Sequence, residues 1–217
     1  MRDDALPPIT ARLLLEAYAS GVFPMADGAD TDEIFWVDPK TRGVVPLDGL
    51  HVSKSLYKRL KRKDYEVRYN TRFIDVVRAC ADREETWINA EILSLYQDLH
   101  RTGYAHSVET WIDGRLAGGL YGVALGGAFF GESMFSHARD ASKIALCYLV
   151  ARLRAGGFAL LDTQFVTEHL ESMGAVEISR NAYHRLLEDS LNRPANFWRQ
   201  KLADTPHSVM QLRTQMS

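Results

Sequence analysis

Three polar side chains interrupt otherwise apolar, strand-like segments and have the types and spacing to do chemistry. Glu132 is the only Asp, Glu, Lys or Arg between Arg115 and Arg139, and Asp162 and Gln164 stand two residues apart in LLDTQF. Because side chains at positions i and i+2 of a strand point to the same face, we expect the Asp162 carboxylate and the Gln164 amide to lie side by side. Buried polar groups without partners cost about 1–3 kcal/mol each, so these three side chains need a reason to be there.

Each of these groups has an ordinary structural interpretation and a functional one. Asp162 and Gln164 are either the solvated face of a strand or an orienting pair. In that pair, Asp162 accepts from the Gln164 NH2 group, which leaves the Gln164 carbonyl oxygen to accept from a nucleophilic amine. Glu132 is either paired with a neighbour in the fold, for example an Arg, or serves as an acceptor for a substrate ammonium group in an apolar pocket.

A short basic segment is the third candidate for function. Six of the ten residues from 54 to 63 are Lys or Arg, while Leu56 and Leu60 lie off the basic face of the predicted helix. Such a run is often only a solvated helix face, but it can also contact the phosphate backbone of a nucleic acid. The residues predicted to share this basic face are Lys54, Lys58, Lys61 and Arg62.

Composition excludes several classes of protein. The chain has 217 residues, 46% of them hydrophobic and 25% charged, with a net charge of −2, as expected for a globular protein with a sizeable core. The cysteines, Cys80 and Cys147, lie far apart, the N-terminus MRDDALPP has no apolar signal region, and no apolar run is long enough to cross a bilayer. We therefore expect a cytoplasmic protein without a membrane contact.

The chain also lacks HExxH, CxxC, a Walker loop and a nucleophile elbow, so we expect no metal and no covalent mechanism.

The hydrophobic periodicity predicts helices and strands in mixed order around these residues. Thr10 is the expected N-cap of the first helix, Gly21 its C-terminal glycine, and Asp113-Gly114 a hairpin turn. Turns and short strands are expected over residues 22–49. The predicted helices are Ala11–Ser20, His51–Arg62, Thr71–Ala81, Ala90–Arg101, Ala141–Ala155, Thr167–Met173 and Ala182–Leu191. The predicted strands are Tyr65–Tyr69, Ala105–Ile112, Arg115–Ala124, Ala128–Glu132 and Phe158–Val166.

This order predicts an α+β protein in which helices cover a sheet containing an antiparallel meander. The length of the chain suits one large domain or a small domain fused to a larger one. The order of the elements is similar to that of the GNAT acyltransferase fold. A CoA-binding member of that fold has a glycine-rich turn before the helix that follows the central strands, whereas this chain has SHARDASK there. The sequence therefore offers no candidate site for CoA, and we expect no cofactor.

An ordered set of motifs gives the resemblance to a known family. LLLEAYASGVFPM, FWVDP, DREETWI, GYAHSVETW, GGLYGV, FFGESMFS, DASKIAL, GGFALLDTQF and NFW occur in this order from about Ala11 to Trp198. The chain thereby resembles the leucyl/phenylalanyl-tRNA–protein transferases. The resemblance implies transfer of Leu or Phe, and sometimes Met, from aminoacyl-tRNA to the α-amine of proteins that begin with Lys or Arg. The product carries a signal for protein degradation (an N-degron). The resemblance also implies a small N-terminal α/β domain over residues 1–50 and a GNAT-like catalytic domain over residues 51–217, which works without CoA or metal.

The resemblance also implies roles for individual residues. Gln164 contacts the attacking amine, Asp162 supports it, and Glu132 helps to hold the aminoacyl-adenosine end. The basic helix with Lys61 and Arg62 meets the tRNA acceptor stem. The residues implied to contact the aminoacyl group or the adenosine are Trp36, Trp87, Leu120, Phe129, Met134, Ser136, Leu146, Leu149, Leu153 and Leu161.

Two other functions fit parts of the sequence. A CoA-dependent N-acetyltransferase would use the same fold, but the missing glycine-rich turn argues against it. A non-catalytic tRNA-binding module would explain the basic helix, but it leaves Glu132, Asp162 and Gln164 without a role. Replacement of Gln164 distinguishes a transferase from a binding module, because tRNA binding by a non-catalytic module does not depend on Gln164.

Overall fold

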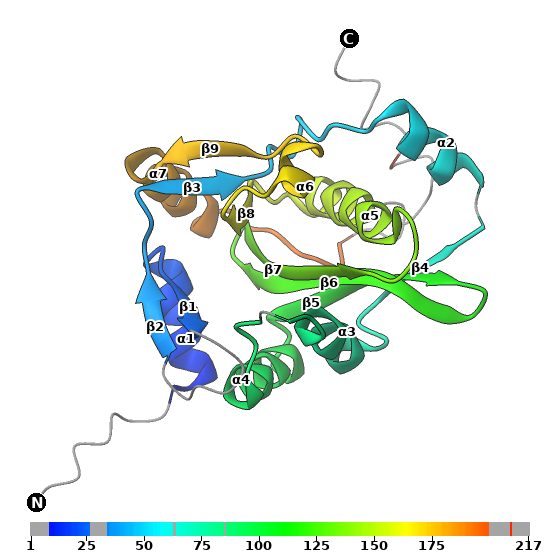
Figure 1. Ribbon diagram of the computed structural model, residues 1–217. Helices are drawn as coiled ribbons and strands as arrows, with labels where there is room; N and C mark the ends of the chain where they lie inside the picture. The colour runs from blue at the N-terminus through cyan, green and yellow to red at the C-terminus, as the bar shows by residue number, and fades with distance from the viewer. Residues whose placement is uncertain (1–8, 27–33, 63, 85, 200–208, 210–217) are drawn as a thin grey trace, which may run out of the picture.

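A seven-stranded sheet forms the centre of the protein (Figure 1). The computed structural model describes residues 9–26, 34–62, 64–84, 86–199 and 209. The strands lie in the order β4 (Glu66–Tyr69), β5 (Ala105–Ile112), β6 (Arg115–Leu125), β7 (Ala128–Ser136), β8 (Leu160–Gln164), β3 (Thr41–Val44) and β9 (Val176–Ser179). All neighbours pair antiparallel except β7 and β8, which run parallel. A separate hairpin pairs β1 (Phe23–Ala26) with β2 (Ile34–Val37).

Helices cover both faces of this sheet and form two apolar cores. One core packs beneath α5 (Ala141–Gly156), α2 (Lys54–Arg62) and the short α6 (Glu168–Glu171). The other packs against α1 (Ala11–Ala19), α3 (Phe73–Ala81), α4 (Ala90–Arg101) and α7 (Arg180–Leu191). Figure 1 shows α5 on one side of β6 and β7 and α3 on the opposite side. The architecture is therefore a mixed α/β sandwich of three layers, and the prediction of a sheet covered by helices is confirmed.

Local sequence signals account for the ends of several elements. The Thr10 side chain accepts from the Leu13 amide at the start of α1, and Asn89 accepts from the Ile92 amide at the start of α4. In the β5–β6 hairpin, Asp113 and Gly114 both have positive φ, as a tight turn between twisted strands requires. The Thr10 cap and the turn at Asp113-Gly114 are those that the sequence analysis predicts, whereas the cap at Asn89 was not predicted.

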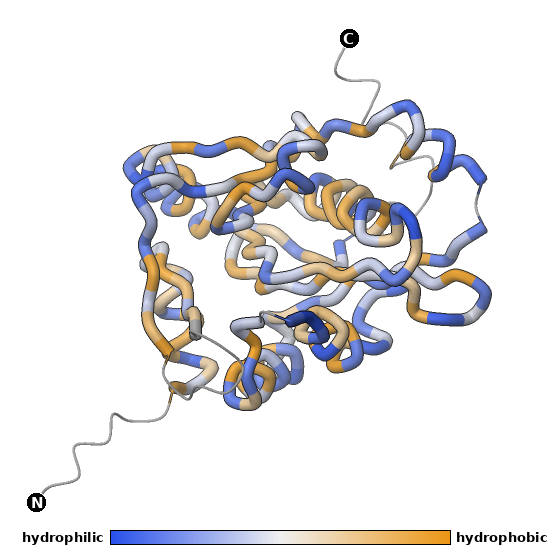
Figure 2. Tube along the Cα trace, in the orientation of Figure 1, coloured by the Kyte–Doolittle hydropathy of each residue, from blue (hydrophilic) through white to orange (hydrophobic). Residues whose placement is uncertain are grey.

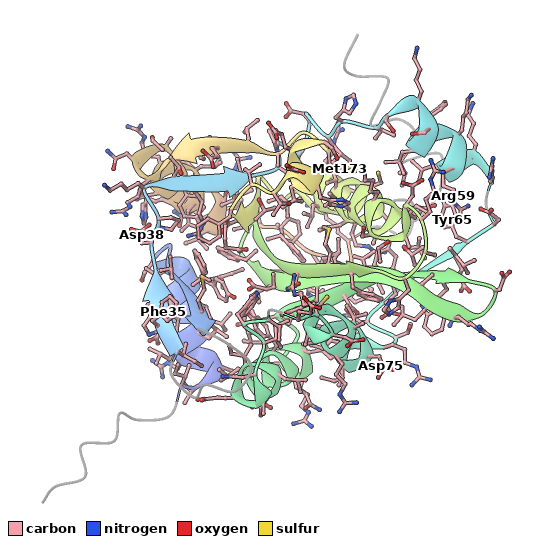
Figure 3. All side chains as sticks on the ribbon, in the orientation of Figure 1. Phe35, Asp38, Arg59, Tyr65, Asp75 and Met173 are labelled. Atoms are coloured by element: carbon pink, nitrogen blue, oxygen red, sulfur yellow. The ribbon has the colours of Figure 1, made fainter. Side chains whose placement is uncertain are left out.

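Helix α5 is apolar on nearly all sides because it packs against strands β5, β6 and β7 of the sheet and also against α2. Figure 2 shows it as one of the most hydrophobic segments of the chain. A helix that is apolar all round is typical of a fully buried position. Its neighbour α2 is amphipathic and buries Leu56 and Leu60. Near the end of α2, Arg59 lies over the Tyr65 ring (Figure 3). Arg59 also forms an ion pair with Asp64.

Most predicted elements are present with shifted ends, but β9 was not predicted. The prediction of a strand ending at Glu132 was too short, since β7 continues to Ser136. The predicted helix 167–173 contains only the four residues of α6, and α2 begins at Lys54 instead of His51. Strand β3 lies inside the large sheet between β8 and β9, so residues 41–44 belong to that sheet although they precede residue 50.

Candidate active site

The central sheet opens where its two parallel strands separate. Pairing of β7 with β8 ends at Phe130 and Asp162. Beyond these two positions, β7 continues along β6, and β8 pairs with β3 at its last residues. The residues that follow the last paired positions, among them Glu132 and Gln164, line a cavity. A gap between parallel strands exposes backbone and side chains from both edges to one ligand, so it is a natural place for a binding site.

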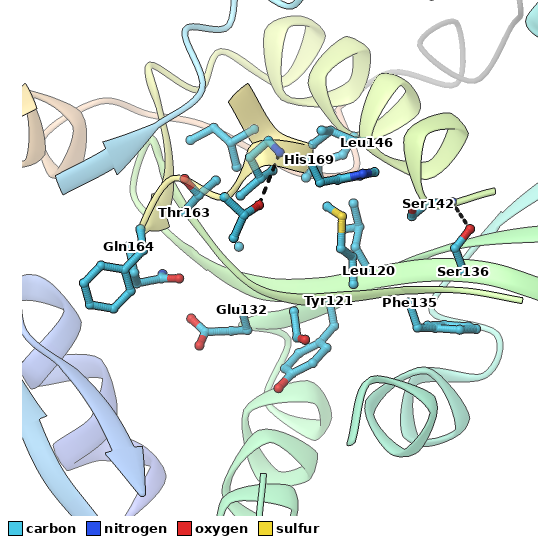
Figure 4. A pocket seen from close by; sticks show the side chains of 18 of the residues that line it. Leu120, Tyr121, Glu132, Phe135, Ser136, Ser142, Leu146, Thr163, Gln164 and His169 are labelled. Atoms are coloured by element: carbon cyan, nitrogen blue, oxygen red, sulfur yellow. Dashed lines mark hydrogen bonds between the residues drawn. The ribbon is translucent and has the colours of Figure 1, made fainter. Parts of the chain in front are cut away.

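The cavity has a volume of about 770 Å³, within the usual range for small-molecule sites. Figure 4 shows Gln164 and Glu132 toward one end of it, Ser136 and Ser142 toward the other, and Leu120 between them. Apolar side chains from the four elements β6, β7, α5 and β8 contribute to the wall: Leu120, Met134, Leu146, Leu149 and Leu161. Two cationic residues, Arg83 and Lys143, also line it.

Glu132 is turned toward the cavity by an irregularity in β7. Opposite it, Gly122 pairs with Gly131 and Tyr121 pairs with Ser133, so Glu132 has no partner residue in β6. A bulge of this kind adds one residue to one strand and re-aims its side chain, and bulges are frequent beside active sites. The sequence analysis did not predict this bulge, although an isolated strand glycine such as Gly131, directly before Glu132, often marks one.

Two tyrosines hold the Glu132 carboxyl group. The Tyr18 hydroxyl lies 2.7 Å from Oε1 and the Tyr96 hydroxyl 2.7 Å from Oε2, while the two hydroxyls are 2.6 Å apart. Burial raises the pKa of Glu132 to about 7, although the hydrogen bonds from the two tyrosines act in the opposite direction. Glu132 therefore has partners within the fold, as the first of its two interpretations expects, but these partners are two tyrosines and not an arginine.

Asp162 lies in a buried network in which Arg42 is the main partner. Arg42 donates from Nε to Oδ1 at 2.9 Å and from Nη2 to Oδ2 at 2.7 Å, and the Tyr183 hydroxyl donates to Oδ2 at 2.9 Å. Arg42 and Asp162 are 1% and 0% exposed. Asp162 also accepts from the backbone amide of Gln164 at 2.9 Å. The predicted bond from the Gln164 side-chain NH2 group to Asp162 is therefore wrong, because the backbone amide makes that contact instead.

The backbone explains why the prediction of side-by-side side chains fails. Gln164 has a φ of +58°, in the left-handed region, and the Phe165 amide donates to the Thr163 carbonyl at 2.6 Å across it. This tight turn ends the strand, so the two-residue alternation no longer applies. Gly43 permits the turn, because a Cβ there would approach the Phe165 carbonyl carbon to 2.6 Å.

Several polar atoms at the cavity are buried without a hydrogen-bond partner among the described residues. They are Gln164 Nε2, Thr163 Oγ1, His169 Nε2 and the Tyr121 hydroxyl. Native proteins leave few buried polar atoms unpaired, and each one needs an explanation. Because all four belong to side chains that line the same cavity, a polar ligand is the simplest partner for them.

The structure brings most of the sequence-predicted contact residues to this cavity. Its wall includes Trp87, Leu120, Met134, Ser136, Leu146, Leu149 and Leu161. Three predicted residues lie elsewhere. Phe129 precedes the point where the strands separate and stacks on Phe197, while Leu153 is fully buried in the core near the end of α5. Trp36 lies on β2, is 38% exposed, and does not line the cavity.

The basic helix α2 lies apart from the cavity. Its predicted basic face is exposed, and Leu56 and Leu60 are buried, so the predicted orientation of the helix is confirmed. It packs against α5, toward the end of the molecule opposite the β1–β2 hairpin (Figure 1). Neither Lys61 nor Arg62 lines the cavity, so any role of this helix concerns a ligand that extends beyond it.

Sequence reasoning missed the residues that fix the polar groups in place. Arg42, Tyr18, Tyr96 and Tyr183 come from four segments far apart in the chain, and no motif connects them to Glu132 or Asp162. Within the described part of the chain, no three His, Cys, Asp or Glu residues are grouped to hold a metal ion. None of the helices in that part is long and apolar enough to span a bilayer.

Two family models and full-length relatives match this chain. The family model for leucyl/phenylalanyl-tRNA protein transferase matches residues 44–188, and the model for the N-terminal domain of the same family matches residues 8–40. A leucyl/phenylalanyl-tRNA–protein transferase of Ruegeria sp. (strain TM1040) is 60% identical over 96% of this chain and 99% of its own length. One from Cereibacter sphaeroides (strain ATCC 17023) is 54% identical over 97% of this chain and 99% of its own.

Among solved structures, FemX is similar with a TM-score of 0.50 and 11% identity, over 81% of this chain and 70% of its own. At this identity, the similarity concerns the fold alone. The matches to the family models and the close relatives extend over nearly the whole chain and include the residues that separate β7 from β8. The chain therefore belongs to the leucyl/phenylalanyl-tRNA protein transferase family.

Proposed function

We propose that this chain is an aminoacyltransferase that moves a leucyl or phenylalanyl group from its tRNA to the N-terminal α-amine of a protein. The observation that carries the proposal is the position of the cavity. An apolar wall that fits such a side chain ends at the gap between β7 and β8, where the side-chain NH2 group of Gln164 has no hydrogen-bond partner within the described part of the chain. Family membership supports the same reaction.

The reaction needs little chemical activation by the enzyme. The aminoacyl group is held on the tRNA by an ester, so the attacking amine forms a C–N bond while the bond from the carbonyl carbon to the ribose oxygen breaks. One proton leaves the amine, and the ribose oxygen takes up a proton. Correct positioning of two bound reactants can lower a barrier by about 7–11 kcal/mol, so positioning is the main task of the site.

In this proposal, Gln164 orients the attacking amine through its carbonyl oxygen and does not remove the proton, because a neutral amide is a very poor base. Asp162 fixes the Gln164 backbone through the bond from its amide. The apolar wall selects the side chain by fit, which discriminates by about 1–3 kcal/mol per methylene group. Trp87 and Ser136 contact the aminoacyl-adenosine end, and Lys54, Lys58, Lys61 and Arg62 contact phosphates further along the acceptor stem.

We further propose that the acceptors are proteins beginning with Lys or Arg, that the product is an N-degron, and that the reaction takes place in the cytoplasm. In the proposed layout, residues 1–50 form the small N-terminal domain, whose last strand β3 joins the large sheet, and residues 51–217 form a GNAT-like catalytic domain. Support for this layout comes from the parallel pair β7–β8 within an otherwise antiparallel sheet and from the similarity to FemX.

A transfer assay tests the proposal directly. Labelled Leu-tRNA and Phe-tRNA are offered with peptides that begin with Arg, Lys, Asp or Glu, using wild type and Gln164→Ala in parallel. We expect labelled peptide with Arg and Lys, and a large loss in the variant. Thr102→Ala, a change on the exposed C-cap of α4, is a control that should transfer normally. No transfer to any peptide while charged tRNA still binds would refute the enzymatic function.

A further inference from the structure

The hydroxyl groups of Tyr18 and Tyr96 form a closed triangle with the carboxyl group of Glu132. Its three oxygen–oxygen contacts measure 2.6 Å between the hydroxyls, 2.7 Å from Tyr18 to Oε1 and 2.7 Å from Tyr96 to Oε2. All three lie within the range of an O–H···O hydrogen bond, and each such bond needs one proton between its two oxygens. Tyr18 and Tyr96 are fully buried, so water does not compete for them.

Counting protons decides the state of this triangle. Each tyrosine supplies one O–H group, and an ionised carboxylate supplies none. Two protons cannot occupy three contacts, and the contact left without one would place two oxygen lone pairs against each other. A protonated Glu132 supplies the third proton, so that each group donates once and accepts once around the ring.

We propose that Glu132 is a neutral carboxylic acid in the unliganded protein, held in that state and orientation by Tyr18 and Tyr96. The carboxyl O–H donates to one tyrosine, this tyrosine donates to the other, and the second donates back to the carbonyl oxygen of Glu132. Tyr18 and Tyr96 are thereby positioning residues, since they act on the cavity through Glu132.

The surroundings of Glu132 agree with a neutral acid. Burial raises the pKa of Glu132 to about 7. The nearby negative charge of Asp162 acts in the same direction, and the positive charge of Arg42 acts against it, but these two residues are already paired with each other. The titratable and charged groups that face Glu132 come from α1, α4, β6, β8 and β3: Tyr18, Tyr96, Tyr121, Asp162 and Arg42.

A neutral acid suits the proposed aminoacyl transfer, on which this part of the inference rests. An ionised carboxylate beside an α-amine would favour the ammonium form, which has no lone pair for attack. A neutral carboxyl group still accepts a hydrogen bond from the amine through its carbonyl oxygen, without adding a negative charge. Glu132 then contributes to orientation while the amine stays nucleophilic, which differs from the role as an ammonium acceptor that the sequence alone indicates.

Infrared difference spectroscopy on the full chain tests the protonation state without any substrate. The spectrum of wild type minus Glu132→Gln at pH 6 should contain the C=O band of a protonated carboxyl group, and this band should disappear as the pH is raised. Glu188→Gln, a change at an exposed glutamate on α7, is the matched control and should show only ionised carboxylate at pH 6. If wild type minus Glu132→Gln shows only carboxylate bands at pH 6, the closed ring is wrong.

Transfer activity tests the role of the neutral form. A glutamine amide can donate to one tyrosine and accept from the other, so Glu132→Gln keeps the ring closed and its charge at zero. We expect it to retain transfer that Glu132→Ala loses, by a factor of about 10 or more, the equivalent of one net hydrogen bond. Equal loss in both variants would show that an ionised carboxylate is required and would overturn the role. If wild type itself transfers nothing, the proposed function fails, while the infrared result still decides the state of Glu132.

Discussion

Replacement of Asp162 by asparagine isolates the charge of the buried ion pair from its shape. Asp162 accepts from Arg42 twice, from Tyr183 and from the Gln164 backbone amide, and it is completely buried. Asparagine has the same size, but one of its oxygen acceptors becomes an NH2 donor. That donor would face Arg42 or Tyr183, which themselves donate, and the Arg42 guanidinium would remain buried without a counter-charge.

The burial of the Arg42–Asp162 pair gives the expected loss of folding stability in Asp162→Asn. Removing one partner of a buried ion pair costs about 3–5 kcal/mol, because the other charge stays buried and unpaired. The total stability of a natural domain is about 5–15 kcal/mol, so Asp162→Asn should unfold far more easily but still fold. By contrast, an exposed ion pair contributes about 0–1 kcal/mol. The pair Arg101–Asp98, with side chains 67% and 53% exposed, supplies the control Asp98→Asn.

Urea unfolding followed by circular dichroism measures these differences. Wild type, Asp162→Asn, Arg42→Met and the double variant complete a double-mutant cycle. We expect the double variant to be less destabilised than the sum of the two single variants by about 2 kcal/mol or more, since no unpaired charge remains. Transfer by Asp162→Asn under conditions where it is folded should also fall, because Gln164 loses its fixed geometry.

Two results would refute this reasoning. A loss of less than about 1 kcal/mol for Asp162→Asn would mean that the buried charge of Arg42 finds another partner. Additive effects in the cycle would mean that Arg42 and Asp162 act independently, in spite of the bidentate contact between them.

Three further predictions concern the core, the cavity and the basic helix. Burial lowers the pKa of His106 to about 4, so the folded state resists protonation. About 3 kcal/mol of folding stability should therefore be present above pH 6.5 and be lost as the pH falls toward 4. Urea unfolding at several pH values should show a smaller loss in His106→Asn than in wild type. Equal pH dependence in the two proteins would contradict this prediction. Leu149→Phe narrows the cavity and should reduce kcat/KM for Phe-tRNA relative to Leu-tRNA by about tenfold, whereas an unchanged ratio would place the side-chain site elsewhere. The double variant of Lys61 and Arg62 to alanine should reduce the slope of log affinity for tRNA against log salt by about 1–2, and parallel slopes would exclude phosphate contacts by these residues.

The sequence by itself determined the helices and strands whose periodicity is strong and whose ends carry local signals. Thr10 and Asn89 act as caps, and Asp113-Gly114 makes the hairpin turn, because these effects depend on neighbours within a few residues. It also indicated Glu132, Asp162 and Gln164, since polar residues in apolar strands are costly wherever they lie. The motifs led to the family, and the matches over nearly the whole chain confirmed it.

The tertiary structure decided what surrounds those residues. Arg42 and Tyr183 reach Asp162 from segments 120 and 21 residues away, and Tyr18 reaches Glu132 over 114 residues. Sequence patterns carry no information about such contacts, because they depend on which strands become neighbours, and β3 enters the sheet between β8 and β9.

Irregularities of the backbone decided the directions in which the Glu132 and Gln164 side chains point. A bulge turns Glu132 toward the cavity, and a left-handed turn at Gln164 breaks the alternation from which side-by-side placement was predicted. Both arise where the parallel strands β7 and β8 separate, and the cost of each is offset by packing across the whole sheet. A local sequence pattern assumes regular strands, so it finds the residues of this site but not the geometry that makes them act together.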